Sequence, residues 1–265
     1  GARGGARGGA QGPGGGGRGA GGGAMAAAGP GDWYNGLPPV TRALGTAMVF
    51  AAAGVQLGLL GPDAFVMSWY RVASNLEVWR LLSTFVFIGG FSFNFLMQLL
   101  MLHNYGISLE NSTFLNRQAD FLWMLLFAAA AFLLTSLVLN IHFYASPLIF
   151  MLCYVWSRNN PEAQVSIMGF FRVPGFYLPW AWCAMGVIMG GSPVPDLMGI
   201  FVGHLYYFFT VLYPRRTGKD PLRTPGFVHT LAGYAGFAAM PQAAGQAAQR
   251  AGGGFRGRGQ RLGED

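Results

Sequence analysis

The stretch that decides the fold is Asp196-Leu-Met-Gly199-Ile-Phe-Val-Gly203-His204-Leu-Tyr-Tyr-Phe-Phe-Thr-Val-Leu-Tyr213, in which two glycines lie four residues apart within an apolar run. On a helix, this spacing places both glycines on one face and leaves a groove without Cβ atoms. A second helix can approach that groove closely and gain van der Waals contact that lipid does not supply. The motif alone fits any closely packed helix pair, so its setting depends on the rest of the chain.

The composition is that of a membrane protein. Of the 265 residues, 52% are hydrophobic and only 10% are charged, whereas soluble domains average about 25% charged residues. The apolar residues occur in long blocks, which indicates a chain that crosses a membrane several times. Cys153 and Cys183 lie inside these blocks, so we expect small core residues there rather than a disulfide or a metal site. No cofactor is indicated.

Six apolar segments predict an all-α, six-helix membrane domain over residues 32–213. Thr41 is the candidate N-cap of the first helix. The connection 61–91 contains an apolar part too short to span and is expected to lie at the membrane interface. The fourth, fifth and sixth segments are shorter than the roughly 20 residues that cross a bilayer, so we expect local thinning of the membrane. The predicted helices are 41–60, 92–109, 119–138, 141–156, 176–189 and 197–213.

The flanking segments and the charges predict a topology. Residues 1–31 and 214–265 are rich in Gly and Ala with scattered Arg, and we expect both segments to be disordered because they have too few large apolar residues for a core. With the N-terminus in the cytosol, only Arg71 and Arg80 of the 17 Lys and Arg residues fall outside, so the positive-inside rule places both termini in the cytosol. This topology explains the net charge of +7, and no nucleic-acid partner is expected.

The second predicted helix carries a polar face. Asn94, Gln98 and Tyr105 fall within about 40° of one another on a helical wheel at 3.6 residues per turn. Polar groups that face lipid are costly, so these side chains should face the bundle interior or a wet cavity. The start of the fourth helix could extend that face with Asn140, His142, Tyr144 and Ser146. Hydrogen bonding between helices explains the pattern equally well.

A serine protease is one reading of the sixth helix. Rhomboid proteases have six helices, a Gly-x-Ser-Gly motif on the fourth and His-x-x-Gly-x-x-x-Gly on the sixth. Here Gly199 and Gly203 match the glycines, but Asp196 stands in place of the histidine, and Ser146 lacks both flanking glycines. Because a serine nucleophile needs a base within hydrogen-bond reach, we expect no catalytic dyad. A rival dyad of Ser146 with His204 stays open, although we interpret His204 as a packing or hydrogen-bonding residue.

The chain resembles the Derlins, the rhomboid-like pseudoproteases of endoplasmic-reticulum-associated degradation. The resemblance covers about residues 31–228. It rests on Trp79-Arg80, on Gly199-Ile-Phe-Val-Gly203-His204-Leu-Tyr, and on Gly31-Asp-Trp-Tyr34, Arg117-Gln-Ala-Asp-Phe121, Tyr154-Val-Trp156 and Tyr177-Leu-Pro-Trp180. It implies a rhomboid-like fold, no catalytic activity, and a multi-pass protein of the endoplasmic reticulum membrane. The Trp-Arg pair is expected to anchor the luminal loop, with the Trp79 ring at headgroup level and the Arg80 guanidinium on a phosphate or a carbonyl.

The last residues resemble the SHP box, Phe-x-Gly-x-Gly-x-x-Leu, by which Derlins recruit the AAA+ unfoldase valosin-containing protein. Phe255 and Leu262 are the apolar anchors, and Gly257 and Gly259 between them let an extended peptide lie close to a partner surface. Because a disordered segment loses entropy on binding, we expect modest affinity.

The resemblance implies retrotranslocation of misfolded proteins from the endoplasmic reticulum to the cytosol. The implied partners are the ATPase, a membrane ubiquitin ligase complex, misfolded clients, the lipid bilayer and further copies or subunits in an oligomer. Two alternatives stay open. One is an intramembrane protease that uses Ser146 and His204, and the other is a scaffold that recruits the ATPase without contacting substrate.

Overall fold

The computed structural model of the chain describes residues 30–139, 141–167, 169 and 171–234. The short helix α1 (Pro30–Asn35) belongs to an N-terminal unit that ends at Asn35. All other described elements belong to a second unit that begins at Gly36. This second unit is mostly helical, as predicted.

The helices of the second unit follow the predicted order with different bounds. Three are close to expectation, and these are α2 (Pro39–Gln56), α6 (Gln118–Thr135) and α8 (Leu178–Ile188), the last entered through a 3₁₀ turn (Gly175–Tyr177). The second predicted helix begins as α5 (Phe93–Met101) and continues through π-helical turns at Leu102–Gly106 and Leu109–Thr113. The fourth is α7 (Ala145–Asn159).

The sixth predicted helix is longer than expected. It comprises α9 (Pro193–Tyr207), a π-helical turn (Phe208–Leu212) and α10 (Tyr213–Thr217), so neither the predicted start at 197 nor the stop at 213 holds. Ser192 precedes α9 and its hydroxyl accepts a hydrogen bond from the Val194 amide, which accounts for the early start. The end comes at Gly218, whose positive φ of 68° suits the left-handed residue that terminates many helices.

Two described helices are long and apolar enough to cross a membrane. They are α6, with a mean hydropathy of 1.6, and the continuous helix Pro193–Thr217, with a mean hydropathy of 1.4. The segment Gly175–Ile188 is apolar but shorter. Six membrane crossings and cytosolic termini therefore stay predictions.

The connection 61–91 is built from short helical pieces and determines where α7 begins. These pieces are a 3₁₀ turn (Pro62–Ala64), α3 (Trp69–Ser74) and α4 (Arg80–Ser83). The amide of Met67 donates to the His142 carbonyl at 3.0 Å, and the Tyr144 amide donates to the Thr84 carbonyl at 2.9 Å. Because the backbone of His142 and Tyr144 is hydrogen-bonded to the connection, the helix that we predicted to begin at residue 141 begins only at Ala145.

The prediction of a purely helical protein is wrong at one place. Strands β1 (Gln164–Ile167) and β2 (Phe171–Pro174) pair antiparallel, with Gln164 opposite Pro174 and Ile167 opposite Phe171. Apolar residues alternate with polar ones along β1, which is the period of a half-buried strand, and Ile167 is buried. Each strand has only four residues, which is too short for periodicity alone to identify it in the sequence.

The prediction of a disordered tail from residue 214 is also wrong for its first part. Helix α10 extends to Thr217, and α11 (Gly226–Tyr234) follows. Val228 and Ala232 lie one turn apart on α11, and both are buried in a small cluster with Ala119 of α6. Two apolar residues at helical spacing are enough to dock this helix, although the segment as a whole is poor in apolar residues.

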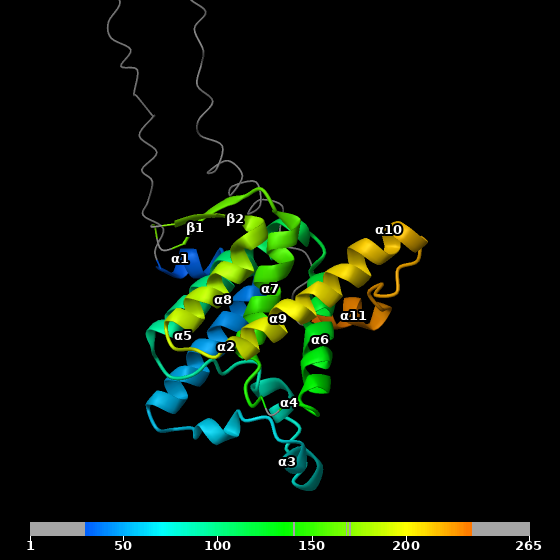
Figure 1. Cartoon of the computed structure of the whole chain (residues 1–265). Helices are drawn as coiled ribbons and strands as arrows, with labels where there is room; N and C mark the ends of the chain where they lie inside the picture. Colours follow the sequence, from blue (N-terminus) through cyan, green and yellow to red (C-terminus); the bar gives the residue numbers. More distant parts are fainter. Residues whose placement is uncertain (1–29, 140, 168, 170, 235–265) are drawn as a thin grey trace, which may run out of the picture. The chain divides into compact units, whose positions relative to one another are not determined.

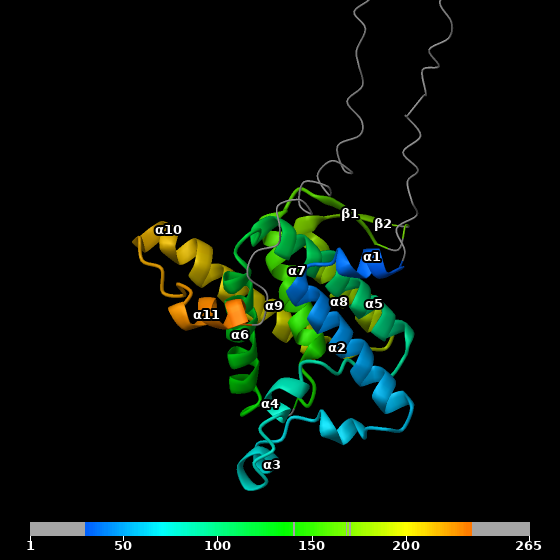
Figure 2. The ribbon, with the colours of Figure 1, turned by 180° about the vertical axis from the view of Figure 1, so that it is seen from behind.

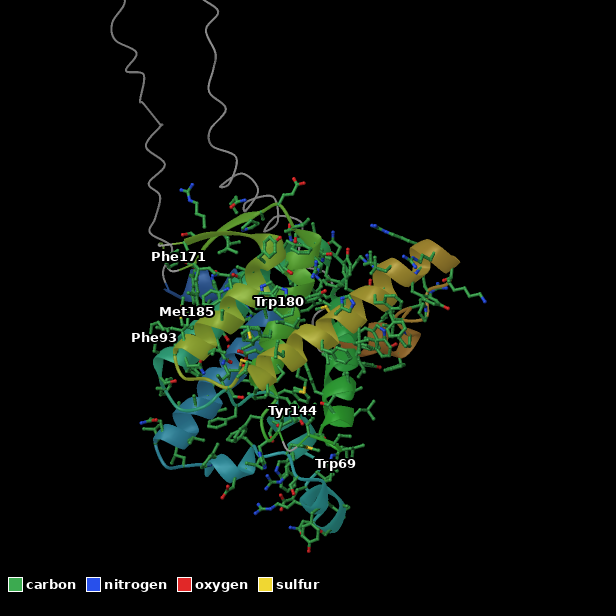
Figure 3. All side chains as sticks on the ribbon, viewed as in Figure 1. Trp69, Phe93, Tyr144, Phe171, Trp180 and Met185 are labelled. Carbon is green, nitrogen blue, oxygen red and sulfur yellow. The ribbon has the colours of Figure 1, made fainter. Side chains whose placement is uncertain are left out.

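Helix α7 is the centre of the second unit. Almost all of its residues from Ala145 to Ser157 are buried, and α8 and α9 lie along it in the views from both sides (Figures 1 and 2). Tyr144 lies inside the bundle, whereas the labelled Trp69 and Phe171 lie toward opposite ends of it (Figure 3). Aromatic side chains at both ends are typical of a protein with two membrane interfaces.

A buried carboxylate ties α2 to the second long helix. Glu110 is 2% exposed, and its oxygens accept hydrogen bonds from the amides of Val40 and Thr41 at 3.0 and 2.9 Å and from the Thr41 hydroxyl at 2.7 Å. Free amides at a helix start attract negative charge. The predicted N-cap is therefore misplaced: Pro38 is the N-cap residue, and Thr41 lies inside the helix, held by Glu110.

Candidate functional site

The two glycines of α9 place that helix directly against the backbone of α7. A Cβ atom at Gly199 would lie 2.3 Å from the Pro147 carbonyl oxygen, and one at Gly203 would lie 3.0 Å from Cβ of Tyr154. The distance at Gly199 is shorter than any real side chain shows, so only glycine permits this spacing there, and the distance at Gly203 is at the tight limit of real contacts. The contact brings the first turn of α9 beside the first turn of α7.

At that end of the pair, Ser146 of α7 meets Asp196 of α9. The Ser146 hydroxyl donates to Asp196 Oδ1 at 3.2 Å, and Asp196 is only 8% exposed. Both residues line a cavity of about 670 Å³. The rest of its lining comes from the end of the connection 61–91, the start of α5, the residues before α7, the end of α8, the α8–α9 turn and the start of α9. The cavity therefore combines polar side chains with apolar walls among helices that were predicted to span a membrane.

Two of the three residues predicted to form a polar face line this cavity. Asn94 and Gln98 of α5 are among its lining residues, and Gln98 Nε2 donates to Asn94 Oδ1 at 3.4 Å. Tyr105 is not among them. Its hydroxyl accepts a hydrogen bond from Trp182 Nε1 at 3.1 Å, deep in the bundle. The polar face is thus divided, with one part toward the cavity and one part in a contact between helices.

His204 lies in a different environment from Ser146. Its Nδ1 atom is 2.8 Å from the Tyr154 hydroxyl, and its ring packs edge-on against the Tyr154 ring. Tyr154 is on α7, eight residues after Ser146, so the two positions are separated by about 12 Å along the helix. The structure does not bring Ser146 and His204 together as a dyad, and it gives His204 the hydrogen-bonding role that we expected.

The Trp-Arg pair at the start of α4 divides into an exposed and a buried residue. Trp79 is 56% exposed, whereas Arg80 is 4% exposed. The Arg80 guanidinium donates to the carbonyls of Asp63 and Val66, the latter at 2.9 Å, and it pairs with the Glu77 carboxylate. The hydrogen bond from Arg80 is the main reason that the pKa of Glu77 lies below its usual value of 4.5. Of the two expected partners of Arg80, phosphate or carbonyl, the structure shows the carbonyl.

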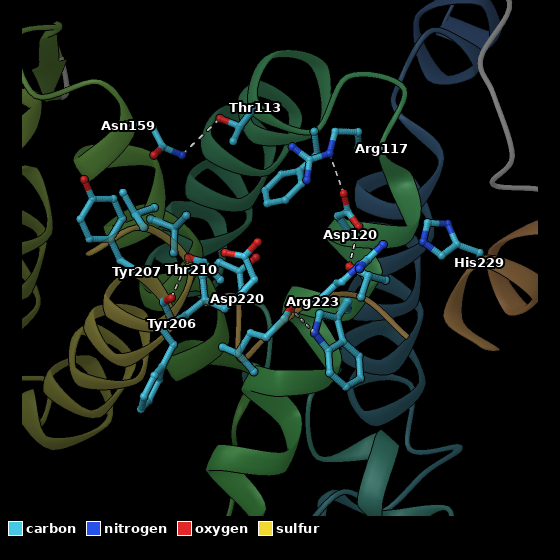
Figure 4. Close-up of a pocket in the computed structure, with 17 residues that line it drawn as sticks. Thr113, Arg117, Asp120, Asn159, Tyr206, Tyr207, Thr210, Asp220, Arg223 and His229 are labelled. Carbon is cyan, nitrogen blue, oxygen red and sulfur yellow. Dashed lines mark hydrogen bonds and ion pairs between the residues drawn. The ribbon is translucent and has the colours of Figure 1, made fainter. Parts of the chain in front are cut away.

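A second hollow of about 510 Å³ lies where the segment after α10 docks on α6 (Figure 4). Asp120 accepts hydrogen bonds there from Arg117, at 2.6 Å, and from the Thr224 hydroxyl. The Trp123 indole donates to the Leu222 carbonyl at 3.1 Å. Acidic and basic side chains are mixed around this hollow, and the hydrogen bonds from Thr224 to Asp120 and from Trp123 to the Leu222 carbonyl hold the segment on α6. We therefore interpret it as the anchor of the segment 220–234.

The predicted ATPase-binding residues lie outside the described part of the chain. They are Phe255, Gly257, Gly259 and Leu262.

Sequence reasoning missed the importance of Asp196 as a cavity residue. It was noted only as the residue that replaces a histidine. The available signal was an acidic residue in the first turn of an apolar helix, since carboxylates in such segments are rare and face the interior. The contribution of the α8–α9 turn, residues 189–192, was also missed, because its glycines indicate only a turn.

A sequence model of the Der1-like family matches residues 37–226. The chain is 45% identical over 204 residues to Derlin-1.2 of Zea mays, covering 76% of this chain and 84% of that protein. It is 43% identical over 237 residues to Derlin-1 of Oryza sativa subsp. japonica, covering 88% of this chain and 98% of that protein. It is 36% identical over 213 residues to Derlin-2.1 of Zea mays, covering 76% and 85%.

Proposed function

Because the chain belongs to the Der1-like family, as its resemblance to the Derlins predicted, we propose that it acts in endoplasmic-reticulum-associated degradation. It is a multi-pass protein of the endoplasmic reticulum membrane with six spanning helices and both termini in the cytosol. It moves misfolded luminal or membrane clients toward the cytosol and cleaves none of them. It works beside a membrane ubiquitin ligase complex and further subunits.

The observation that carries this proposal is the polar cavity among apolar helices. Asn94, Gln98, Ser146 and Asp196 supply polar groups that a polypeptide can bind when it leaves water. Helix α7 has 15 residues and α8 has 11, so α7 is about 22 Å long against a hydrocarbon thickness of about 30 Å. Helices this short favour a thinned bilayer, which lowers the barrier for a client further. The sixth helix does not contribute to this thinning, because the continuous helix Pro193–Thr217 has 25 residues.

The cavity is tested by photocrosslinking in membranes. A photoreactive residue at Asn94, which is exposed and lines the cavity, should capture a misfolded client during its degradation. The matched control is the same residue at Leu134 of α6, which is 67% exposed and does not line the cavity. Capture at neither position would favour the scaffold, which recruits the ATPase without contacting clients, and equal capture at both positions would mean that the cavity is not the client site.

The absence of proteolysis is tested at Ser146. Its hydroxyl bonds to a carboxylate, and His204 bonds to Tyr154, so neither has the partner that a serine protease needs. In Ser146→Ala client turnover should continue, because Asn94, Gln98 and Asp196 still supply polar groups to the cavity. A loss of turnover together with the loss of a defined cleavage product would instead support the protease.

Recruitment of an AAA+ unfoldase of the valosin-containing-protein type belongs to the C-terminal segment in this proposal. The chain is anchored on α6 as far as α11, which ends at Tyr234. The twenty residues 235–254 then separate the anchor from Phe255, and they can reach at most about 70 Å. Purified full-length protein should retain the ATPase, and Phe255→Ala/Leu262→Ala should not. Equal retention by both proteins would remove the recruitment role and leave the cavity result untouched.

A further inference from the structure

We propose that the cavity selects clients whose apolar segment carries a lysine, and that Asp196 and Gln98 bind its ammonium group. The inference rests on the proposed function, because it requires that client segments enter the cavity. It adds a chemical class of client, which neither the fold nor the family comparison provides.

The first support is an acidic group without a cationic partner. Asp196 Oδ1 accepts from Ser146, whereas Asp196 Oδ2 makes no hydrogen bond with the described residues. Across from Oδ2 lies Gly186 of α8, where a Cβ atom would come within 3.2 Å of that oxygen. Glycine at 186 therefore leaves space beside the free carboxylate oxygen. Among the fifteen described residues that line the cavity there is no Lys or Arg, and His142 is the sole basic side chain.

The second support is an independent, unpaired acceptor in the same cavity. Gln98 is 7% exposed, its Nε2 atom donates to Asn94, and its Oε1 atom has no hydrogen-bond partner among the described residues. A buried carbonyl oxygen without a donor is costly, and natural proteins contain few of them. The arrangement suits a ligand that brings donors and no acceptors.

The third support is a recess that both acceptors share. A space of about 40 Å³ is lined by Gln98 and Asp196 together with Asn94, Gly186 and apolar side chains of α5, α7 and α8. A cavity needs about 10–15 Å³ of such volume to hold one water molecule, so this recess is large enough for a small polar group. An ammonium group is compact and carries three donors, whereas a guanidinium is a planar fork with five.

The remaining cavity walls suit the rest of a lysine side chain. Ile88, Ile141, Met189 and Val194 present apolar surface around the polar centre. A lysine buries its four methylene groups along such surface while its charged head reaches a polar partner. In a client, a lysine within an apolar segment is costly in lipid, so such a segment gains most by moving into this cavity.

The test compares client segments that differ at one position. Each client carries the same apolar segment with Lys, Arg or Leu at its centre, and the full-length protein carries a photoreactive residue at Val194. Val194 lines the cavity and is 50% exposed, and it does not line the recess. The wild type should capture the Lys client about tenfold more than the Leu client, because one charge-assisted hydrogen bond changes affinity by about that factor. Capture of the Arg client should lie between the two.

Variants of the two acceptors decide the assignment. Asp196→Asn keeps the shape and the acceptor for Ser146 but removes the charge, so the preference for Lys should fall about tenfold. Gln98→Leu should reduce the preference, and Gln98→Glu should increase it. Glu162→Gln is the control, because it removes one negative charge from an exposed loop after α7. The thermal unfolding midpoint of each purified variant verifies that it folds.

Two outcomes would overturn the proposal, and they are distinguishable. Equal capture of the Lys and Leu clients by the wild type, or an unchanged preference in Asp196→Asn, removes the lysine selection while the client path stands. Failure to capture any client at Val194 removes the client path itself, and the selection falls with it.

Discussion

The α7–α9 contact and the connection 61–91 are both held tightly, but by opposite means. At Gly199 the helices touch through bare backbone, and any side chain would separate them. In the connection, the chain forms only short helical pieces, and the buried guanidinium of Arg80 binds the Asp63 and Val66 carbonyls and the Glu77 carboxylate. At the α7–α9 contact there is no flexible side chain that could adjust to a substitution at Gly199. The connection depends on one charged side chain, so it responds to substitution and to pH in ways that the α7–α9 contact does not.

The largest effect should come from closing the glycine groove. Gly199→Ala places a methyl group 2.3 Å from the Pro147 carbonyl oxygen, so α9 must move away from α7 at a cost of about 3 kcal/mol of unfolding free energy. Gly45→Ala on α2 is the matched control, since its methyl group meets only the tip of Leu102 at 3.8 Å, and alanine is the better helix former by about 1 kcal/mol. Thermal unfolding in detergent measures both. Equal unfolding midpoints for Gly199→Ala and Gly45→Ala would mean that the α7–α9 contact does not stabilise the bundle.

A smaller and local effect should follow the loss of Arg80. Arg80→Gln removes the charge and most of the donors to the Asp63 and Val66 carbonyls, which should cost about 2 kcal/mol. Because the connection is separate from the α7–α9 contact, we expect faster proteolysis within 61–91 and little change in the rest of the chain. Arg71→Gln, on the exposed face of α3, is the control. Limited proteolysis followed by mass spectrometry locates the cuts, and cuts spread evenly over the chain would contradict a local role.

The smallest effect should be a pH dependence of the connection. The pKa of Glu77 is lowered in the folded protein, chiefly by its hydrogen bond with Arg80, so the ionised carboxylate stabilises the fold. That contribution is complete above the usual pKa of 4.5 and is lost as the pH falls through the lowered, folded-state value. The unfolding midpoint of the wild type minus that of Glu77→Gln should therefore shrink as the pH falls below about 4.5. A difference that stays constant from pH 7 to pH 3 would exclude this linkage.

The same comparison shows how far sequence reasoning reached. The glycine spacing predicts a close helix contact because its physics is local to one helix, and the order of the helices follows from the apolar blocks. The anchor of the connection was not predictable in detail, because two partners of Arg80 are backbone carbonyls that any residue supplies. Docking of α11 was missed for a related reason. Val228 and Ala232 are buried only because Ala119 of α6 packs against them, and the local sequence does not show that contact.

The candidate site was predictable in part. Asn94 and Gln98 share a helix face, and both line the cavity, but Tyr105 on that face bonds to Trp182 instead. A helical wheel shows in which direction around the helix axis each side chain points. It does not show which other helix packs against that face at each position along the axis. The pairing of Ser146 with Asp196 joins residues 50 positions apart, and it depends on the depth at which α9 crosses α7.

The bond between Glu110 and the start of α2 also has a consequence for biogenesis. The carboxylate that holds the Thr41 amide follows it by 69 residues in the chain. During synthesis, α2 therefore leaves the ribosome long before its partner does, and its first amides have only water or other polar surroundings to satisfy them. The first helix can take its final position only after the segment that carries Glu110 has been synthesised and has folded, so the two helices mature as one step.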